Sequence, residues 1–96
     1  MGAQTFHIQV KGKTAQEAFQ SAVEKARWDY GHAGYTGTIA EKSEFTMIPL
    51  PDDKNADSYA EELIREDDAR IGDKWGPAGC IQSGPESFVF FGWASS

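Results

Sequence analysis

The sequence predicts a single domain of the α+β class, residues 1–96, and three observations lead to that prediction. The chain has 96 residues, enough for one modest hydrophobic core. Residues 5–11 alternate apolar and polar side chains as a half-buried strand does, whereas residues 15–30 repeat apolar side chains every three or four positions, as an amphipathic helix does. Five of the seven residues 87–93 are aromatic or β-branched, and a glycine-proline turn signal precedes them, which predicts a strand that is apolar on both faces.

The first half of the chain gives a strand, a helix and two further strands. The helix begins at a capping box in which Thr14 is the N-cap residue and Glu17 lies three positions later, and Gly31 is its expected C-terminal cap. Between residues 36 and 48, a polar centre favours two strands joined as a hairpin, although one long strand is the alternative interpretation.

The second half gives a helix and two more strands. A second capping box, Ser58 with Glu61, begins a helix that Asp67 interrupts and that Gly72 ends. A short strand at 80–82 then precedes the apolar strand. This order matches a ferredoxin-like βαββαβ(β) sandwich, in which a mostly antiparallel sheet carries both helices on one face.

The charge of the chain is unevenly distributed. The net charge is −6, and residues 51–74, with nine acidic and four basic side chains, account for −5 of it. A binder that follows the phosphates of nucleic acid needs clustered Lys and Arg, so nucleic acid is not the expected partner. No apolar run approaches the ~20 residues of a membrane span. We expect no secretory signal, and the single cysteine fits a cytoplasmic location.

The residue types that bind metals or phosphates do not form a recognisable pattern. The chain has one cysteine and two distant histidines, without the spacing of a metal site, so we expect neither a metal nor a cofactor. The glycine-rich loop Gly31–Gly37 follows a helix C-terminus, where carbonyl groups point outward, rather than the helix N-terminus that a phosphate site requires.

Cys80 is the one candidate nucleophile. A reactive thiolate needs a nearby histidine or a helix N-terminus, and no spacing brings His7 or His32 to this position. We therefore expect a buried structural thiol and a protein that is not an enzyme. The alternative is a small cysteine-dependent enzyme or a ligand-binding domain, with its site around Trp75–Cys80 and the Gly31–Gly37 loop.

Aromatic side chains indicate a surface that binds another protein. His7 lies on the strand face opposite Phe6, Ile8 and Val10, and with both helices on one side it would share an uncovered face with aromatic residues of the last strand. Tryptophans outside the apolar stripe are typical of protein contacts. The residues expected to bind a protein partner, or a second copy of the chain as a homodimer, are Trp28, His7, Phe88, Phe90, Trp75 and Tyr35.

Three stretches, Gly34–Lys42, Asp73–Ile81 and Phe90–Ser95, together resemble small uncharacterised proteins encoded by bacteria and their phages. The resemblance implies a bacterial or mobile-element origin and carries no activity. Small acidic phage proteins are often antagonists of host machinery. We therefore expect a non-enzymatic interaction module, a phage or mobile-element antagonist of a host protein, that acts through the aromatic sheet face or an acidic helix surface comprising Glu61, Glu62, Glu66, Asp67 and Asp68.

Overall fold

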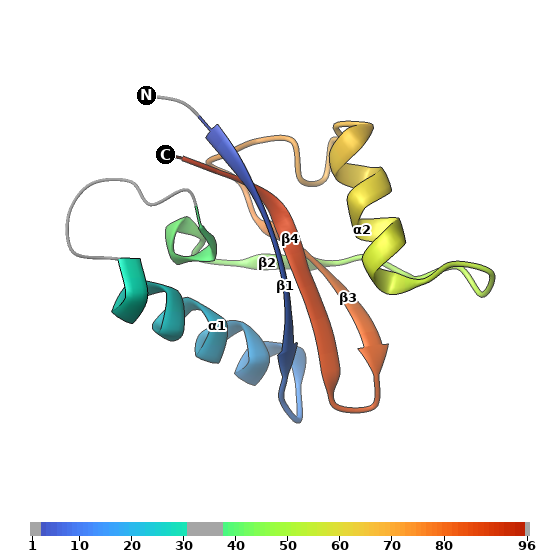
Figure 1. Cartoon of the computed structure of the whole chain (residues 1–96), viewed down its shortest axis with the longest axis horizontal. Coiled ribbons are helices and arrows are strands. Elements are labelled where there is room, and N and C mark those ends of the chain that lie inside the picture. Colours follow the sequence, from blue (N-terminus) through green and yellow to red (C-terminus); the bar gives the residue numbers. More distant parts are fainter. Residues whose placement is uncertain (1–2, 31–37, 96) are drawn as a thin grey trace.

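Two helices enclose a four-stranded mixed sheet from opposite sides (Figure 1). The computed structural model describes residues 3–30 and 38–95. In chain order the elements are β1 (Ala3–Lys11), α1 (Ala15–Tyr30), the 3-10 helix η1 (Ile39–Glu41), β2 (Phe45–Met47), α2 (Ala56–Arg65), β3 (Ala78–Gly84) and β4 (Ser87–Ser95). The α+β class predicted from the sequence is confirmed.

The strand order in the sheet is β1-β4-β3-β2, so the last strand lies between the first and the third. β1 and β4 run antiparallel and pair along their full length, from Ala3 opposite Ser95 to Lys11 opposite Ser87. β4 and β3 are also antiparallel, whereas β3 and β2 are parallel and α2 connects them. The sheet therefore begins and ends in the edge strands β1 and β2.

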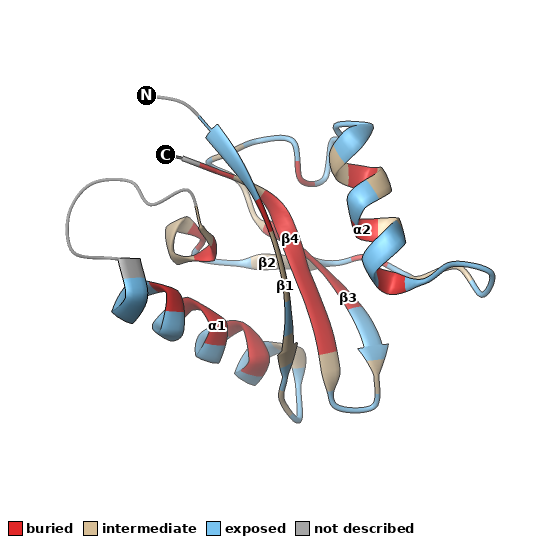
Figure 2. Cartoon of the chain, viewed as in Figure 1, coloured by how far each residue is buried: buried red, intermediate tan, exposed pale blue. Residues whose placement is uncertain are grey.

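Strand β4 is apolar on both faces, as predicted, and each face meets a different helix. Phe88 and Phe90 belong to the core beneath α1, whereas Val89 and Phe91 belong to a second core beneath α2. The Phe90 ring lies 5.6 Å from that of Phe19 on α1, measured between centroids. Figure 2 shows buried residues along most of β4, which both cores share.

The prediction that both helices lie on one face is wrong, and the ferredoxin-like strand order is not confirmed. The apolar stripe of α2 includes Ala60 and Leu63 and packs with Val89 and Phe91, away from α1. A central strand with two apolar faces loses contact with water on both sides only if each face is covered. Placing one helix on each face satisfies that requirement within a single chain.

Of the two strands predicted between residues 36 and 48, the second, residues 44–48, is confirmed in part as β2, whereas the first, residues 36–41, and the alternative of one long strand are wrong. Residues 36 and 37 lie outside the described residues, and Ile39–Glu41 form a 3-10 turn. The Thr38 hydroxyl accepts a hydrogen bond from the Ala40 N–H at 3.2 Å and so begins this turn, which carries the buried Ile39 into the core beneath α1. Only Phe45–Met47 then pairs with the sheet.

The helix ends follow local capping rules, with two corrections. Thr14 does cap α1, since its hydroxyl accepts a bond from the Glu17 N–H at 3.1 Å. For α2, the cap is Asn55 rather than Ser58. The helix ends near Asp67 rather than at Gly72. There a Schellman motif places Asp67 at a φ of 54°.

Close packing against the core beneath α2 requires a glycine at position 79 in β3. A Cβ atom at this position would lie 2.7 Å from Phe91 and 2.8 Å from Ile71. Gly84, in the same strand, has ordinary space, with its nearest neighbour at 3.5 Å. The two glycines therefore form a matched pair that separates steric crowding from strand propensity.

We expect Gly79→Ala to lower the free energy of unfolding by about 1–3 kcal/mol, because Phe91 and Ile71 must move to admit the methyl group. Gly84→Ala should change it by less than about 0.5 kcal/mol. Urea denaturation of both variants measures the difference. Equal effects at the two positions would contradict the crowding at Gly79.

Candidate functional site

Strand β1 has one unpaired edge. Among the described residues, β4 is the strand that pairs with it, and it pairs on one side only. On the other side, alternate residues of β1 present main-chain N–H and C=O groups outward. Figure 1 shows this edge lying between α1 and α2, with neither helix lying across it.

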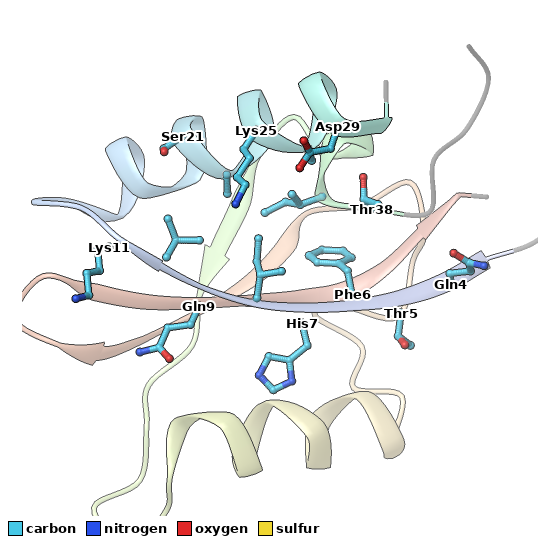
Figure 3. A pocket seen from close by; sticks show the side chains of 15 residues that line it. Gln4, Thr5, Phe6, His7, Gln9, Lys11, Ser21, Lys25, Asp29 and Thr38 are labelled. Carbon is cyan, nitrogen blue, oxygen red and sulfur yellow. The ribbon is translucent and has the colours of Figure 1, made fainter. Parts of the chain in front are cut away.

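A groove with a volume of about 940 Å³ runs along β1 on the side of α1. Its floor is apolar and consists of Phe6, Ile8 and Val10; Ile8 and Val10 are only half-buried. In Figure 3, Phe6 points from β1 towards α1, and Lys25 extends from α1 towards the strand. The groove is thus open, apolar at its base and polar along its wall.

The groove exists because the face of α1 nearest to β1 carries small side chains. Ala22 and Ala26 line it, whereas the larger Phe19 packs on the aromatic rings of Phe45 and Phe90 deeper in the core. Alanine brings a helix close to a sheet but fills little volume beside it. The space left over lies alongside the unpaired edge of β1.

On its other face, β1 is tied to α2 through His7. Its Nδ1 lies 3.0 Å from Glu61 Oε1, and its Nε2 lies 2.9 Å from Asp57 Oδ1. Each carboxylate side chain remains more than half exposed, 57% for Asp57 and 58% for Glu61. The ring can donate to both carboxylates only when both of its nitrogens carry protons. Figure 3 shows His7 pointing towards α2, on the opposite side of the strand from Phe6.

The edge of β1 lacks the features that usually protect an exposed strand. From Ala3 to Lys11 the only formally charged side chain is Lys11, at the end of the strand, and the strand contains no proline. It pairs with β4 residue for residue, so no bulge bends it away from solvent. Natural proteins commonly use charges, prolines or bulges to prevent edge pairing. As far as residues 3–30 and 38–95 show, β1 is therefore open to a further strand.

The structure corrects the predicted aromatic face. Phe88 and Phe90 are 4% and 0% exposed and lie beneath α1, so they do not form an uncovered surface. The register pairs Val10 with Phe88 and Ile8 with Phe90, which places these side chains on one face. His7 lies on the other face, as its alternation with Phe6, Ile8 and Val10 predicted, but not with the two phenylalanines.

The predicted tryptophans are exposed. Trp28 on α1 is 82% exposed and Trp75, in the loop before β3, is 64% exposed. Lys74 Nζ lies 5.5 Å from the centroid of the Trp75 ring. Tyr35 and the Gly31–Gly37 loop lie outside the described residues.

The acidic residues predicted to form one surface have different local roles. Glu61 contacts His7, and Glu62 contacts Lys54 at 3.1 Å. Asp68 accepts hydrogen bonds from Arg70, whose guanidinium lowers the pKa of that carboxyl. Basic side chains of the chain thus already offset part of this acidic surface.

Cys80 is fully buried in the core beneath α1. Burial raises the pKa of its thiol to about 12, because the thiolate would lose its hydration. Within residues 3–30 and 38–95, no group of histidine, cysteine and acidic side chains is arranged to hold a metal ion. The burial of Cys80 and the raised pKa of its thiol are typical of a structural cysteine.

We expect iodoacetamide at pH 8 to modify Cys80 in the native protein at least about a hundredfold more slowly than in the unfolded chain, since little thiolate forms. Mass spectrometry of the alkylated protein measures both rates. Rapid native modification would restore the cysteine-dependent enzyme as a candidate.

The raised pKa of the Cys80 thiol also predicts how the stability of the protein changes with pH. Between pH 9, the ordinary value, and about pH 12, the unfolded thiol loses its proton while the folded one keeps it. Stability from this group is therefore lost as pH rises through that window, by at most about 1.4 kcal/mol per pH unit. Cys80→Ala should remove this slope.

Lys42 is a buried residue that the sequence analysis missed. Its Nζ donates to the carbonyl oxygens of Gly76 at 2.9 Å, Lys74 at 3.2 Å and Asp73 at 3.4 Å. Burial lowers the pKa of this amine, and the charge of Asp73 partly opposes that shift. Lys42 thereby holds the loop that carries Trp75, a role hidden in a stretch that looked like the polar tip of a hairpin.

Comparison with protein-family models, curated proteins and solved structures found no match. The bacterial or phage origin implied by the resemblance stays a prediction. In the part of the chain that the structure describes, the helices are too short or too polar to cross a membrane.

Proposed function

We propose that the protein is a non-enzymatic interaction module that binds an extended segment of another protein as an additional strand beside β1. The observation that carries the proposal is the unpaired edge of β1, with Lys11 at its end as the only formally charged side chain, next to a groove with an apolar floor. In strand addition of this kind, main-chain hydrogen bonds supply affinity and pockets for alternate side chains supply specificity.

The energetics favour this mode of binding. Each main-chain hydrogen bond contributes a net ~0.5–1.5 kcal/mol. Apolar side chains of the added strand would cover the half-buried Ile8 and Val10, which adds a hydrophobic term. Together these terms suit a reversible, micromolar interaction rather than a permanent one.

Capture of a strand would also suit an antagonist encoded by a phage or mobile element, because it blocks a host protein without any chemistry. The support for that role is the resemblance of the three segments described above. The buried thiol of Cys80 weighs against the enzymatic alternative.

Peptides selected from a displayed random library against the immobilised protein provide a test. We expect them to protect alternate β1 amides from hydrogen exchange. We expect Ile8→Lys, which places a charge in the groove, to weaken their binding by roughly tenfold or more. Leu50→Lys is the matched control, since Leu50 is equally half-buried but packs on the core beneath α2.

Circular dichroism and urea denaturation establish that both variants are folded before binding is compared. Selected peptides that leave β1 amides unprotected, or that bind Ile8→Lys and Leu50→Lys equally well, would contradict strand addition.

We further propose that Trp28 contacts the partner at the rim of the groove. Lys25 and Ser21, which line the groove, precede Trp28 by three and seven positions, so the three residues follow one line along α1. Its exposed indole can cover a large apolar area at little entropic cost.

We expect Trp28→Ala to weaken binding of the selected peptides on the order of fivefold. It should change the free energy of unfolding by less than about 0.5 kcal/mol, because the side chain is exposed. Fluorescence anisotropy and urea denaturation measure the two effects. An unchanged affinity would remove Trp28 from the site.

A further inference from the structure

The two faces of β1 offer different surroundings to an added strand. On the α1 side, the floor is apolar, and Lys25 and Asp29, which carry opposite charges, both line the wall; Lys25 extends towards β1 (Figure 3). On the α2 side, the carboxylates of Asp57 and Glu61 flank His7 and remain more than half exposed. Successive side chains of a strand point to opposite faces, so an added strand would meet both surroundings alternately.

The charges argue against a second copy of this chain as the occupant. A symmetric antiparallel pairing of two β1 strands has its two-fold axis perpendicular to the sheet, which places both α2 helices on the same face. Asp57 and Glu61 of each copy would then lie near those of the other, and each copy carries a net charge of −6. This repulsion opposes self-association at low ionic strength.

We infer that the partner segment alternates apolar residues with lysine or arginine, placing the apolar side chains in the groove beneath α1 and the basic ones over Asp57 and Glu61. This inference rests on the proposed function. Adjacent strands lie about 4.8 Å apart, so a long basic side chain next to His7 can reach the free carboxylate oxygens. Beneath α1 the floor is apolar and the charges of Lys25 and Asp29 offset one another, so that side offers basic side chains less than the α2 side does.

The carboxylates supply selectivity more than affinity. They are exposed, and exposed ion pairs contribute little individually, about 1.4- to fivefold in affinity for each pair. A basic segment that forms two such pairs should bind roughly tenfold more tightly at low salt than an acidic segment does. The preference should shrink as added salt screens the charges.

The test uses two nine-residue peptides in which valine alternates with lysine or with glutamate. Fluorescence anisotropy at about 20 mM and about 150 mM salt measures their dissociation constants. We expect the lysine peptide to bind about tenfold more tightly at low salt and to protect β1 amides from exchange. The double variant Asp57→Asn/Glu61→Gln should reduce the preference to about twofold.

A matched double variant controls for net charge. Asp53→Asn/Glu66→Gln removes the same number of charges. Asp53 precedes α2, and Glu66 lies about 140° round the helix from Glu61. This variant should retain most of the preference for lysine, because its substitutions lie away from His7. An equal loss in both variants would mean that only the overall charge matters and would overturn the inference.

N-methylation of the lysine peptide tests the main-chain pairing. Amides at the valines and at the lysines face opposite edges of an extended peptide, so methylation of one set must abolish binding while methylation of the other does not. If both methylated forms bind like the parent, strand addition itself fails, and the charge pattern fails with it.

The remaining outcomes distinguish the basic pattern of the partner segment from strand addition itself. Equal affinity for both peptides with β1 amides protected would overturn the basic pattern and leave strand addition intact. Failure of both peptides to bind would also overturn the pattern, and strand addition would then depend on the selected peptides. If light scattering shows a dimer and Ile8→Lys dissociates it, the basic pattern would be overturned and the occupant of the edge would be a second copy of the chain.

Discussion

Burial of both faces of β4 is the constraint on which the rest of the structure depends. Phe88 and Phe90 need a cover on one side, and Val89 and Phe91 need one on the other. The chain supplies α1 for the first face and α2 for the second. With β4 in the centre, β1 and β2 become the edges, and the groove beside β1 follows from that order.

Much of this architecture could be predicted from local patterns. The alternation along β1, the capping of α1 by Thr14 and the two apolar faces of β4 are all visible in the sequence. The face that each helix covers is not visible, because both helices carry similar stripes of small residues. Two local signals also compete, because Asn55 and Ser58 are both good N-cap residues; a helix that begins after Asn55 includes Ala56, which is buried in the core beneath α2.

The candidate site was predicted only in part, because strand register decides which side chains meet. The alternation of β1 correctly separates His7 from Ile8, but pairing with β4 determines their neighbours, and a shift of one residue would exchange the faces. Asp57 was not singled out, since its contact with His7 joins positions fifty residues apart. The groove depends on Ala22 and Ala26, which in the sequence look only like core residues.

The pairing of β1 with β4 has a consequence for how the chain folds. It joins the first strand to the last, so the sheet forms only after nearly the whole polypeptide has closed on itself, a slow step for so short a protein. Until then β1 has two open edges instead of one, and Phe88 to Phe91 are uncovered. The interval before closure is therefore when aggregation competes with folding, and a chaperone that shields β4 during synthesis would favour the native state.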